Sequence, residues 1–142
     1  MKKTILNSSI LLVISFFLFS CKKPKISFDL AKQELTECSN YGLKEVTIDN
    51  DSIDKKGFAV ELPIILKWEG NTPTPRKISF NNVLKYYKIT KDGKRLVSLK
   101  LMKNASYKIS YHIIGKQDTE IKVWTNKNGK IYKATNENCD ER

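Results

Sequence analysis

The stretch Phe58-Ala-Val-Glu-Leu-Pro-Ile-Ile-Leu-Lys-Trp68 decides the fold. Its apolar residues fall at every second position, at Phe58, Val60, Leu62, Ile64, Leu66 and Trp68. Side chains alternate between the two faces of a β-strand, so this row predicts a long strand in the core with Trp68 buried at its end. Pro63 has no N–H to donate, which predicts a sheet edge or a bulge there.

The same alternation recurs along most of the chain. Further alternating segments begin near Val46, Ile78, Leu84, Tyr107, Ile121 and Ile131. Turn-forming sequences separate them, including Asn50-Asp51-Ser52, residues 70–75, Asp92-Gly93 and residues 126–129. About seven short strands with regular turns predict a mainly β protein, folded as one antiparallel β-sandwich domain over residues 28–142.

One segment has helical spacing instead. Phe28, Ala31, Leu35 and Cys38 follow one another at intervals of three or four residues, as on one face of a helix. Polar residues and Gly42 follow, where a helix would end. The pattern predicts one short N-terminal helix over residues 28–38.

Residues 101–113 resemble the tyrosine corner of fibronectin type III and immunoglobulin-like sandwiches. Leu101 precedes Tyr107 by six residues, and Tyr107 opens an alternating strand. Asn104 stands where that motif often has glycine, and asparagine tolerates left-handed backbone geometry. Lys103 departs from the proline that is common in the motif. The resemblance implies an immunoglobulin-like arrangement of the sandwich.

The N-terminus is typical of a secretory signal. Lys2 and Lys3 precede an apolar run over residues 10–19, which is shorter than the ~20 apolar residues of a spanning helix. Leu18-Phe19-Ser20-Cys21 resembles the lipobox of bacterial lipoproteins. The resemblance implies cleavage after residue 20, a lipid on Cys21 and a tether over residues 21–27. An ordinary signal peptide with an incidental cysteine is the alternative, because Phe19 is larger than the residue usual at that position.

The residues after the cysteine bear on location. Lys22 and Lys23 follow Cys21, and no aspartate does. By resemblance to the usual lipoprotein sorting rule, this favours the outer membrane of a bacterial cell envelope over retention in the inner membrane. The membrane is then one partner, held through the lipid, and the leaflet stays open.

The chain is basic. Removing residues 1–20 lowers the formal charge from +11 to +9, because that segment carries Lys2 and Lys3 and no acid. A basic protein favours anionic partners, here an anionic envelope component or an acidic protein. The only arginines are Arg76, Arg95 and Arg142, and nucleic-acid recognition relies on arginine, so no nucleic acid is expected. Because the lysines are scattered, solvated strand faces are the competing explanation.

Lipidation of Cys21 would leave two cysteines, Cys38 and Cys139. An even pair in an exported protein predicts a disulfide that ties the start of the domain to its end. Two unrelated buried thiols are the alternative.

No catalytic, cofactor or metal motif is present in the sequence. His112 is the only histidine, and neighbouring Ser110 lacks an elbow motif, which indicates a structural histidine rather than a catalytic base. Asp49-Asn50-Asp51 begins like a calcium loop but lacks the glycine and glutamate that complete one. We therefore predict a protein that is not an enzyme and needs no cofactor.

The aromatic residues are the remaining candidates for function. Trp124, Tyr132 and Lys122 fall on two strands of a predicted hairpin and would form a contact surface for a glycan or protein. Packing of Trp124 and Tyr132 against a second sheet is the alternative. These observations predict a lipid-anchored cell-envelope protein that acts by binding. The runner-up is a periplasmic inhibitor or immunity protein directed against an acidic enzyme or toxin.

Overall fold

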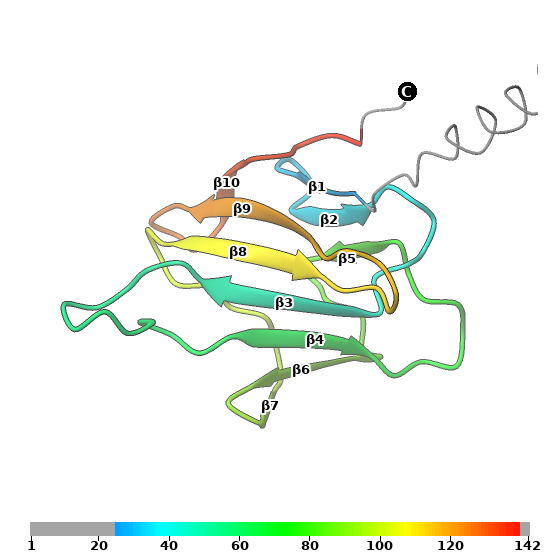
Figure 1. Ribbon diagram of the computed structural model, residues 1–142, viewed down its shortest axis with the longest axis horizontal. Helices are drawn as coiled ribbons and strands as arrows, with labels where there is room; N and C mark the ends of the chain where they lie inside the picture. Colours follow the sequence, from blue (N-terminus) through cyan, green and yellow to red (C-terminus); the bar gives the residue numbers. More distant parts are fainter. Residues whose placement is uncertain (1–24, 140–142) are drawn as a thin grey trace, which may run out of the picture.

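The computed structural model describes residues 25–139 and consists of β-strands joined by turns and loops (Figure 1). The strands are β1 (Ile26–Asp29), β2 (Glu34–Glu37), β3 (Glu45–Asn50), β4 (Ile64–Trp68), β5 (Lys77–Ser79), β6 (Tyr87–Lys91), β7 (Lys94–Leu96), β8 (Ser106–Tyr111), β9 (Thr119–Thr125) and β10 (Ile131–Ala134). Within residues 25–139 there is no helix long and apolar enough to cross a membrane. The predicted signal peptide and Cys21 lie outside the described residues.

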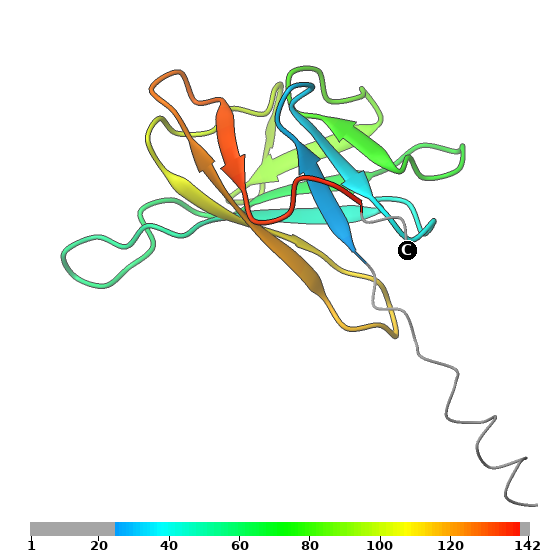
Figure 2. The same ribbon diagram turned by 90° about the horizontal axis from the view of Figure 1, so that it is seen from above.

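The strands form two antiparallel sheets, which confirms the mainly β prediction. One sheet has three strands in the order β1-β2-β5, and the other has seven in the order β10-β9-β8-β3-β4-β6-β7. The small sheet covers one face of the large sheet, as the two perpendicular views show (Figures 1 and 2). The opposite face of the large sheet is left open to solvent and is called here the outer face.

The core fills the space between the two sheets. Phe28, Leu35 and Ile78 of the small sheet are at most 1% exposed. The large sheet contributes alternate residues of its central strands, namely Val46, Ile48, Ile64, Leu66, Tyr107, Ile109, Tyr111, Ile121 and Val123. Burying aliphatic and aromatic side chains of this size stabilises each by about 1.5–3 kcal/mol, so this shared core holds the sheets together.

The predicted helix over residues 28–38 is wrong. The segment is a hairpin in which β1 pairs with β2, with Phe28 opposite Leu35. A four-residue turn joins the strands, and Gln33 within it has a φ of 53°. Seven residues separate Phe28 from Leu35, and this spacing suits a helix face and a cross-strand pair equally. The hairpin forms because both of its strands find partners. β2 hydrogen-bonds to β5, and Phe28 of β1 packs edge-on against Phe80.

The predicted strand over residues 58–68 is half correct. Only Ile64–Trp68 joins the sheet, where β4 pairs with β3 and β6, and Trp68 is 8% exposed as expected. Phe58 is 68% and Leu62 52% exposed, so the first half of the apolar row lies outside the core. β4 is an interior strand that bonds on both sides. Pro63 lacks an N–H for such a ladder and therefore marks the point where the strand begins.

Two local features have the geometry expected from the sequence. The hydroxyl of Tyr107 accepts a hydrogen bond from the Met102 N–H at 2.7 Å, the backbone contact that defines a tyrosine corner, and Asn104 has a φ of 49°. Cys38 and Cys139 form a disulfide that links the end of β2 to the C-terminal segment. Strand β1 begins at Ile26, inside the stretch predicted as tether.

Candidate functional site

The predicted aromatic residues lie together on the outer face of the large sheet. Val123 and Thr125 of β9 point into the core, so Trp124 between them points outward. Lys133 of β10 lies opposite Trp124, and the pairing shifts between Ile131 and Lys133, which leaves Tyr132 in a bulge. The bulge turns Tyr132 out of the ladder, and its side chain is 56% exposed. Packing against the second sheet, the alternative for this pair, does not occur.

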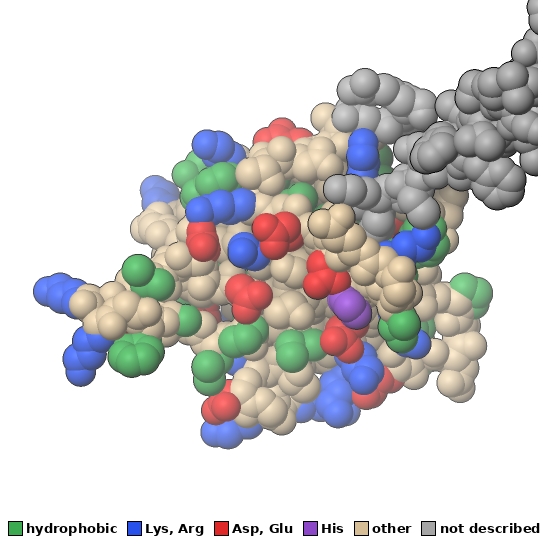
Figure 3. All heavy atoms as spheres, viewed as in Figure 1, with side chains coloured by type: hydrophobic (Ala, Val, Ile, Leu, Met, Phe, Trp, Pro, Cys, Tyr) green, Lys and Arg blue, Asp and Glu red, His purple; other side chains and the backbone are tan. Residues whose placement is uncertain are grey.

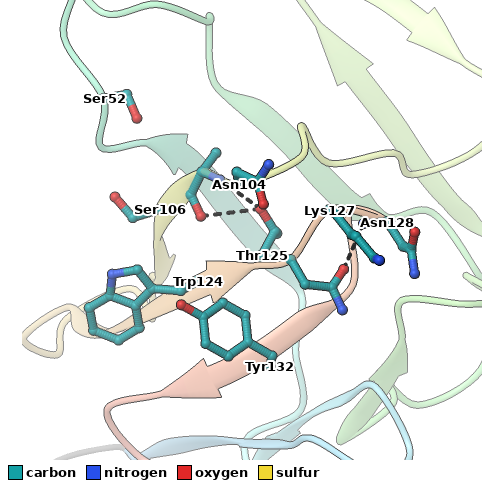
Figure 4. Close-up of a pocket in the computed structure, with 10 residues that line it drawn as sticks. Ser52, Asn104, Ser106, Trp124, Thr125, Lys127, Asn128 and Tyr132 are labelled. Atoms are coloured by element: carbon teal, nitrogen blue, oxygen red, sulfur yellow. Dashed lines mark hydrogen bonds between the residues drawn. The ribbon is translucent and has the colours of Figure 1, made fainter.

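Trp124 and Tyr132 line an open pocket at one end of this face (Figure 4). The pocket has a volume of ≈ 670 Å³. Its remaining lining comes from three places: Ser52 in the β3–β4 loop, residues 104–106 at the start of β8, and residues 125–128 at the end of β9. The lining therefore combines two aromatic rings with hydroxyl and amide groups and one cation, Lys127.

Hydrogen bonds of Thr125 and Asn126 fix the floor of the pocket. Thr125 is 3% exposed, and its hydroxyl donates to the Met102 carbonyl at 2.7 Å and accepts from the Ala105 N–H at 3.0 Å. The Asn126 carboxamide oxygen accepts from the N–H groups of Asn128 and Lys130, which shapes the 126–130 turn. A buried polar group that is fully bonded resists rearrangement, so the pocket is formed before any ligand arrives.

Two lysines contact the Trp124 ring. The Lys133 ammonium lies 4.6 Å from the ring centroid and the Lys122 ammonium 5.6 Å from it. Lys122 also forms an ion pair with Asp51, and this hydrogen bond holds the pKa of the Asp51 carboxyl below its usual value. Lys133 and Lys127 form no ion pair within residues 25–139. The charge of Lys122 is thus neutralised locally, while Lys133 and Lys127 keep the pocket positive.

A second hollow adjoins the first across the 126–130 turn. Its volume is ≈ 440 Å³, and Asn128 borders both. Three of its lining residues are lysines, Lys100, Lys103 and Lys130. Among the described residues that line the two hollows there is no aspartate or glutamate. Sequence reasoning missed this second hollow, because Lys100 and Lys130 are distant in the chain and share no pattern.

Ion pairs occur elsewhere on the outer face. Lys67 lies 4.0 Å from Glu45, and Lys108 lies 3.7 Å from Glu120. Figure 3 shows this face, with acidic and basic side chains mixed across its centre. Exposed pairs of this kind contribute little to stability but cancel the local field. The pocket end of the sheet is therefore where uncompensated cations gather with aromatic rings.

His112 does not form an enclosed site. Its ring pairs with Asp118 across the open β8–β9 turn, and the two side chains are 62% and 63% exposed. Water competes for both groups there, so the pair is explained as an exposed surface contact. No cluster of three or more His, Cys, Asp or Glu side chains that could hold a metal occurs in residues 25–139.

A polar cluster that the sequence did not reveal lies beneath the β3–β4 loop. The Glu61 carboxylate accepts hydrogen bonds from the Lys91 ammonium, from the Tyr107 hydroxyl at 3.0 Å and from the Asn50 carboxamide at 3.4 Å. Burial raises the pKa of Glu61, and the three hydrogen bonds outweigh it and hold the pKa below its usual value. The same burial raises the pKa of Tyr107 to about 12. In the sequence, Glu61 falls between Val60 and Leu62 of the alternating segment, and that pattern does not reveal such partners.

No known protein family, curated protein or solved structure matches this chain.

Proposed function

We propose that the protein is a lipid-anchored cell-envelope protein that binds an anionic glycan through the Trp124–Tyr132 pocket. The observation that carries this proposal is the combination of an outward-facing aromatic pair with two adjoining hollows lined by lysines and by no acid. The lipid would be attached at Cys21 and would hold the domain at the outer membrane.

The chemistry of the pocket suits a sugar. Aromatic rings stack against the apolar faces of sugar rings, and carboxamide and hydroxyl groups bond to sugar hydroxyls. Trp124 and Tyr132 offer the rings, and Asn104, Ser106 and Asn128 offer the polar groups. Lys100, Lys103 and Lys130 would then face phosphate or carboxylate groups on the next units of the ligand. Lysine meets such groups as a mobile point charge, which tolerates variation in their spacing.

The experiment is a titration of the purified protein with two probes, phosphorylated core oligosaccharide from lipopolysaccharide and the same oligosaccharide after dephosphorylation. We expect Trp124→Ala to weaken binding of both probes by about tenfold, because losing the apolar surface that one large aromatic ring buries against a ligand costs about 1.5–3 kcal/mol when burial is complete and less when it is partial. Lys100→Gln/Lys103→Gln should weaken only the phosphorylated probe and reduce its sensitivity to salt.

The control is Phe58→Ala, which removes an aromatic side chain of 68% exposure outside both hollows. This variant should bind both probes as the wild type does. Equal binding by Trp124→Ala and the wild type, or binding of neither probe by the wild type, would refute the proposed ligand.

A further inference from the structure

The loop over residues 51–63 is the most prominent exposed apolar feature of the domain. It joins β3 to β4, neighbours in the large sheet, and projects well beyond the end of that sheet (Figures 1 and 2). Ile53, Phe58, Val60 and Leu62 are between 47% and 71% exposed on it. Single exposed apolar residues are ordinary, but four on one projecting loop mark an interaction surface.

The loop is folded on itself. Ile53 pairs with Ala59 in a β-bridge, and the Val60 N–H donates to the Ser52 carbonyl at 3.0 Å. The Asp54 carboxylate caps the turn by accepting from the N–H groups of Lys56 and Phe58 at 2.8 and 3.0 Å. The root is held by the Glu61 cluster. A preformed element of this kind loses little conformational entropy when it binds, which favours affinity.

The order of side chains along the loop distinguishes between two kinds of partner. Lys55 and Lys56 occupy the turn itself, and the apolar side chains lie on the two arms behind it. The only acid of the turn, Asp54, is engaged by backbone N–H groups. Insertion into a bilayer would carry two ammonium groups in ahead of Phe58, which is costly. An acidic depression with an apolar rim on a partner protein would suit this order. The two lysines would enter the depression and meet its acidic groups, and the apolar arms would pack against the rim.

The direction of the loop agrees with this. β1 and the loop lie near opposite ends of β9. Ile26 of β1 lines the same hollow as Thr119, the first residue of β9. The loop leaves the sheet beside Ser106, which pairs with Trp124 near the other end of β9. Under the proposed lipid anchor, only three residues separate Cys21 from Lys25, and the four steps from one to the other span at most about 14 Å. The membrane would then lie at the β1 end, and the loop would point away from it.

We propose that the 51–63 loop is a docking element that inserts Lys55 and Lys56 into an acidic, apolar-rimmed depression on a partner protein of the envelope. Lys55, Lys56 and the apolar arms lie outside the proposed glycan pocket, although Ser52 at the root of the loop lines it. The direction of the loop relative to the membrane rests on the proposed anchor. Such docking would suit an inhibitor or an immunity protein, the alternative function that the sequence suggested.

The test is site-specific photocrosslinking in the producing cells, with benzoylphenylalanine placed at position 58 of the full chain. The control position is 114, where Ile114 is 88% exposed on the β8–β9 turn. We expect a discrete protein adduct from position 58 and none from position 114. Lys55→Glu/Lys56→Glu should reduce that adduct about tenfold, as expected for charge reversal at a complementary interface. The cross-linked peptide of the partner should come from an acidic surface segment.

Lys85→Glu/Lys116→Glu is the matched charge reversal at exposed lysines outside the loop and outside both hollows, and it should leave the adduct unchanged. Unchanged unfolding midpoints of both double variants would confirm that the effect is local. Adducts insensitive to Lys55→Glu/Lys56→Glu, no protein adduct, or photoproducts with lipid alone would overturn the inference. Failure here leaves glycan binding untouched, and failure of the oligosaccharide titration leaves the adduct untouched, so the two proposals are tested separately.

Discussion

Replacing Glu61 by alanine should destabilise the domain by about 2–3 kcal/mol, because a charged acceptor is removed from three donors at once. The Glu61 side chain is 12% exposed. A hydrogen bond to a charged group contributes about 1.5–3 kcal/mol, and the three bonds share one carboxylate, so their values do not add. Lys91 is 31% exposed and can turn toward water, which limits the loss. Tyr107 loses its acceptor but still accepts from the Met102 N–H.

Urea unfolding of the wild type, Glu61→Ala and a matched control would measure this loss. The control is Glu69→Ala, because Glu69 forms a 3.8 Å pair with Lys88 in which both side chains are more than 40% exposed. Exposed pairs contribute at most about 1 kcal/mol, so Glu69→Ala should shift the midpoint only slightly. If Glu61→Ala and Glu69→Ala cost the same, the cluster is not the anchor of the loop that we describe.

The pH dependence follows from the lowered pKa of Glu61. A carboxyl whose folded pKa lies below its unfolded value of about 4.3 stabilises the protein above that pH, and this contribution is lost as the pH falls through the folded pKa. The wild type should therefore lose more unfolding free energy than Glu61→Gln between about pH 5 and pH 3. If the unfolding free energies of the two proteins fall equally over this pH range, the partners of Glu61 do not stabilise its ionised form and the prediction is wrong.

Three further predictions concern stability. Cys38→Ser/Cys139→Ser opens a loop of 101 residues and should cost about 4–5 kcal/mol in the chain-entropy account, measured by urea unfolding; a loss below about 1 kcal/mol would contradict it. Gln33→Leu should cost about 2–3 kcal/mol, since the Gln33 carboxamide is bonded to both the N–H and the carbonyl of Ile131, and the control Lys32→Leu should be nearly neutral. Gly129→Ala should cost more than Gly93→Ala, because an added Cβ at Gly129 would lie 2.9 Å from the Leu101 carbonyl oxygen whereas the same addition at Gly93 meets open space; equal melting temperatures would refute this reasoning.

The sequence predicted the parts of the fold that depend on neighbouring residues. Alternation predicted the central strands, and Asp92-Gly93 predicted a hairpin. The structure shows that its turn has two residues, because Lys91 pairs with Lys94. It gave the wrong element at residues 28–38, because Phe28 and Leu35 satisfy a helix face and a hairpin pair alike. Which of the two forms depends on β5, more than forty residues later in the chain, and no local pattern carries that information.

Of the candidate site, the sequence predicted only Trp124, Tyr132 and Lys122, whose ammonium lies 5.6 Å from the Trp124 ring centroid. Trp124 and Tyr132 stand out by residue type, and their place on adjoining strands follows from the turn between them. The lysines of the second hollow and the Glu61 cluster are ordinary polar residues in an alternating sequence. Their roles depend on the spatial order β9-β8-β3-β4-β6, which brings Glu61, Lys91 and Tyr107 together from three separate segments.

The fold concentrates both proposed surfaces at one end of the large sheet. Ser52 lines the proposed glycan pocket and lies at the root of the projecting loop. Asp51 beside it pairs with Lys122, whose ammonium lies 5.6 Å from the Trp124 ring centroid. These residues lie near one end of the large sheet. β1, which follows Cys21 in the sequence, begins near the opposite end. A short lipid tether at that end would keep the domain close to the membrane while leaving pocket and loop pointing outward. An anionic glycan and an acidic partner protein repel each other, so binding of one at adjacent positive surfaces would oppose binding of the other.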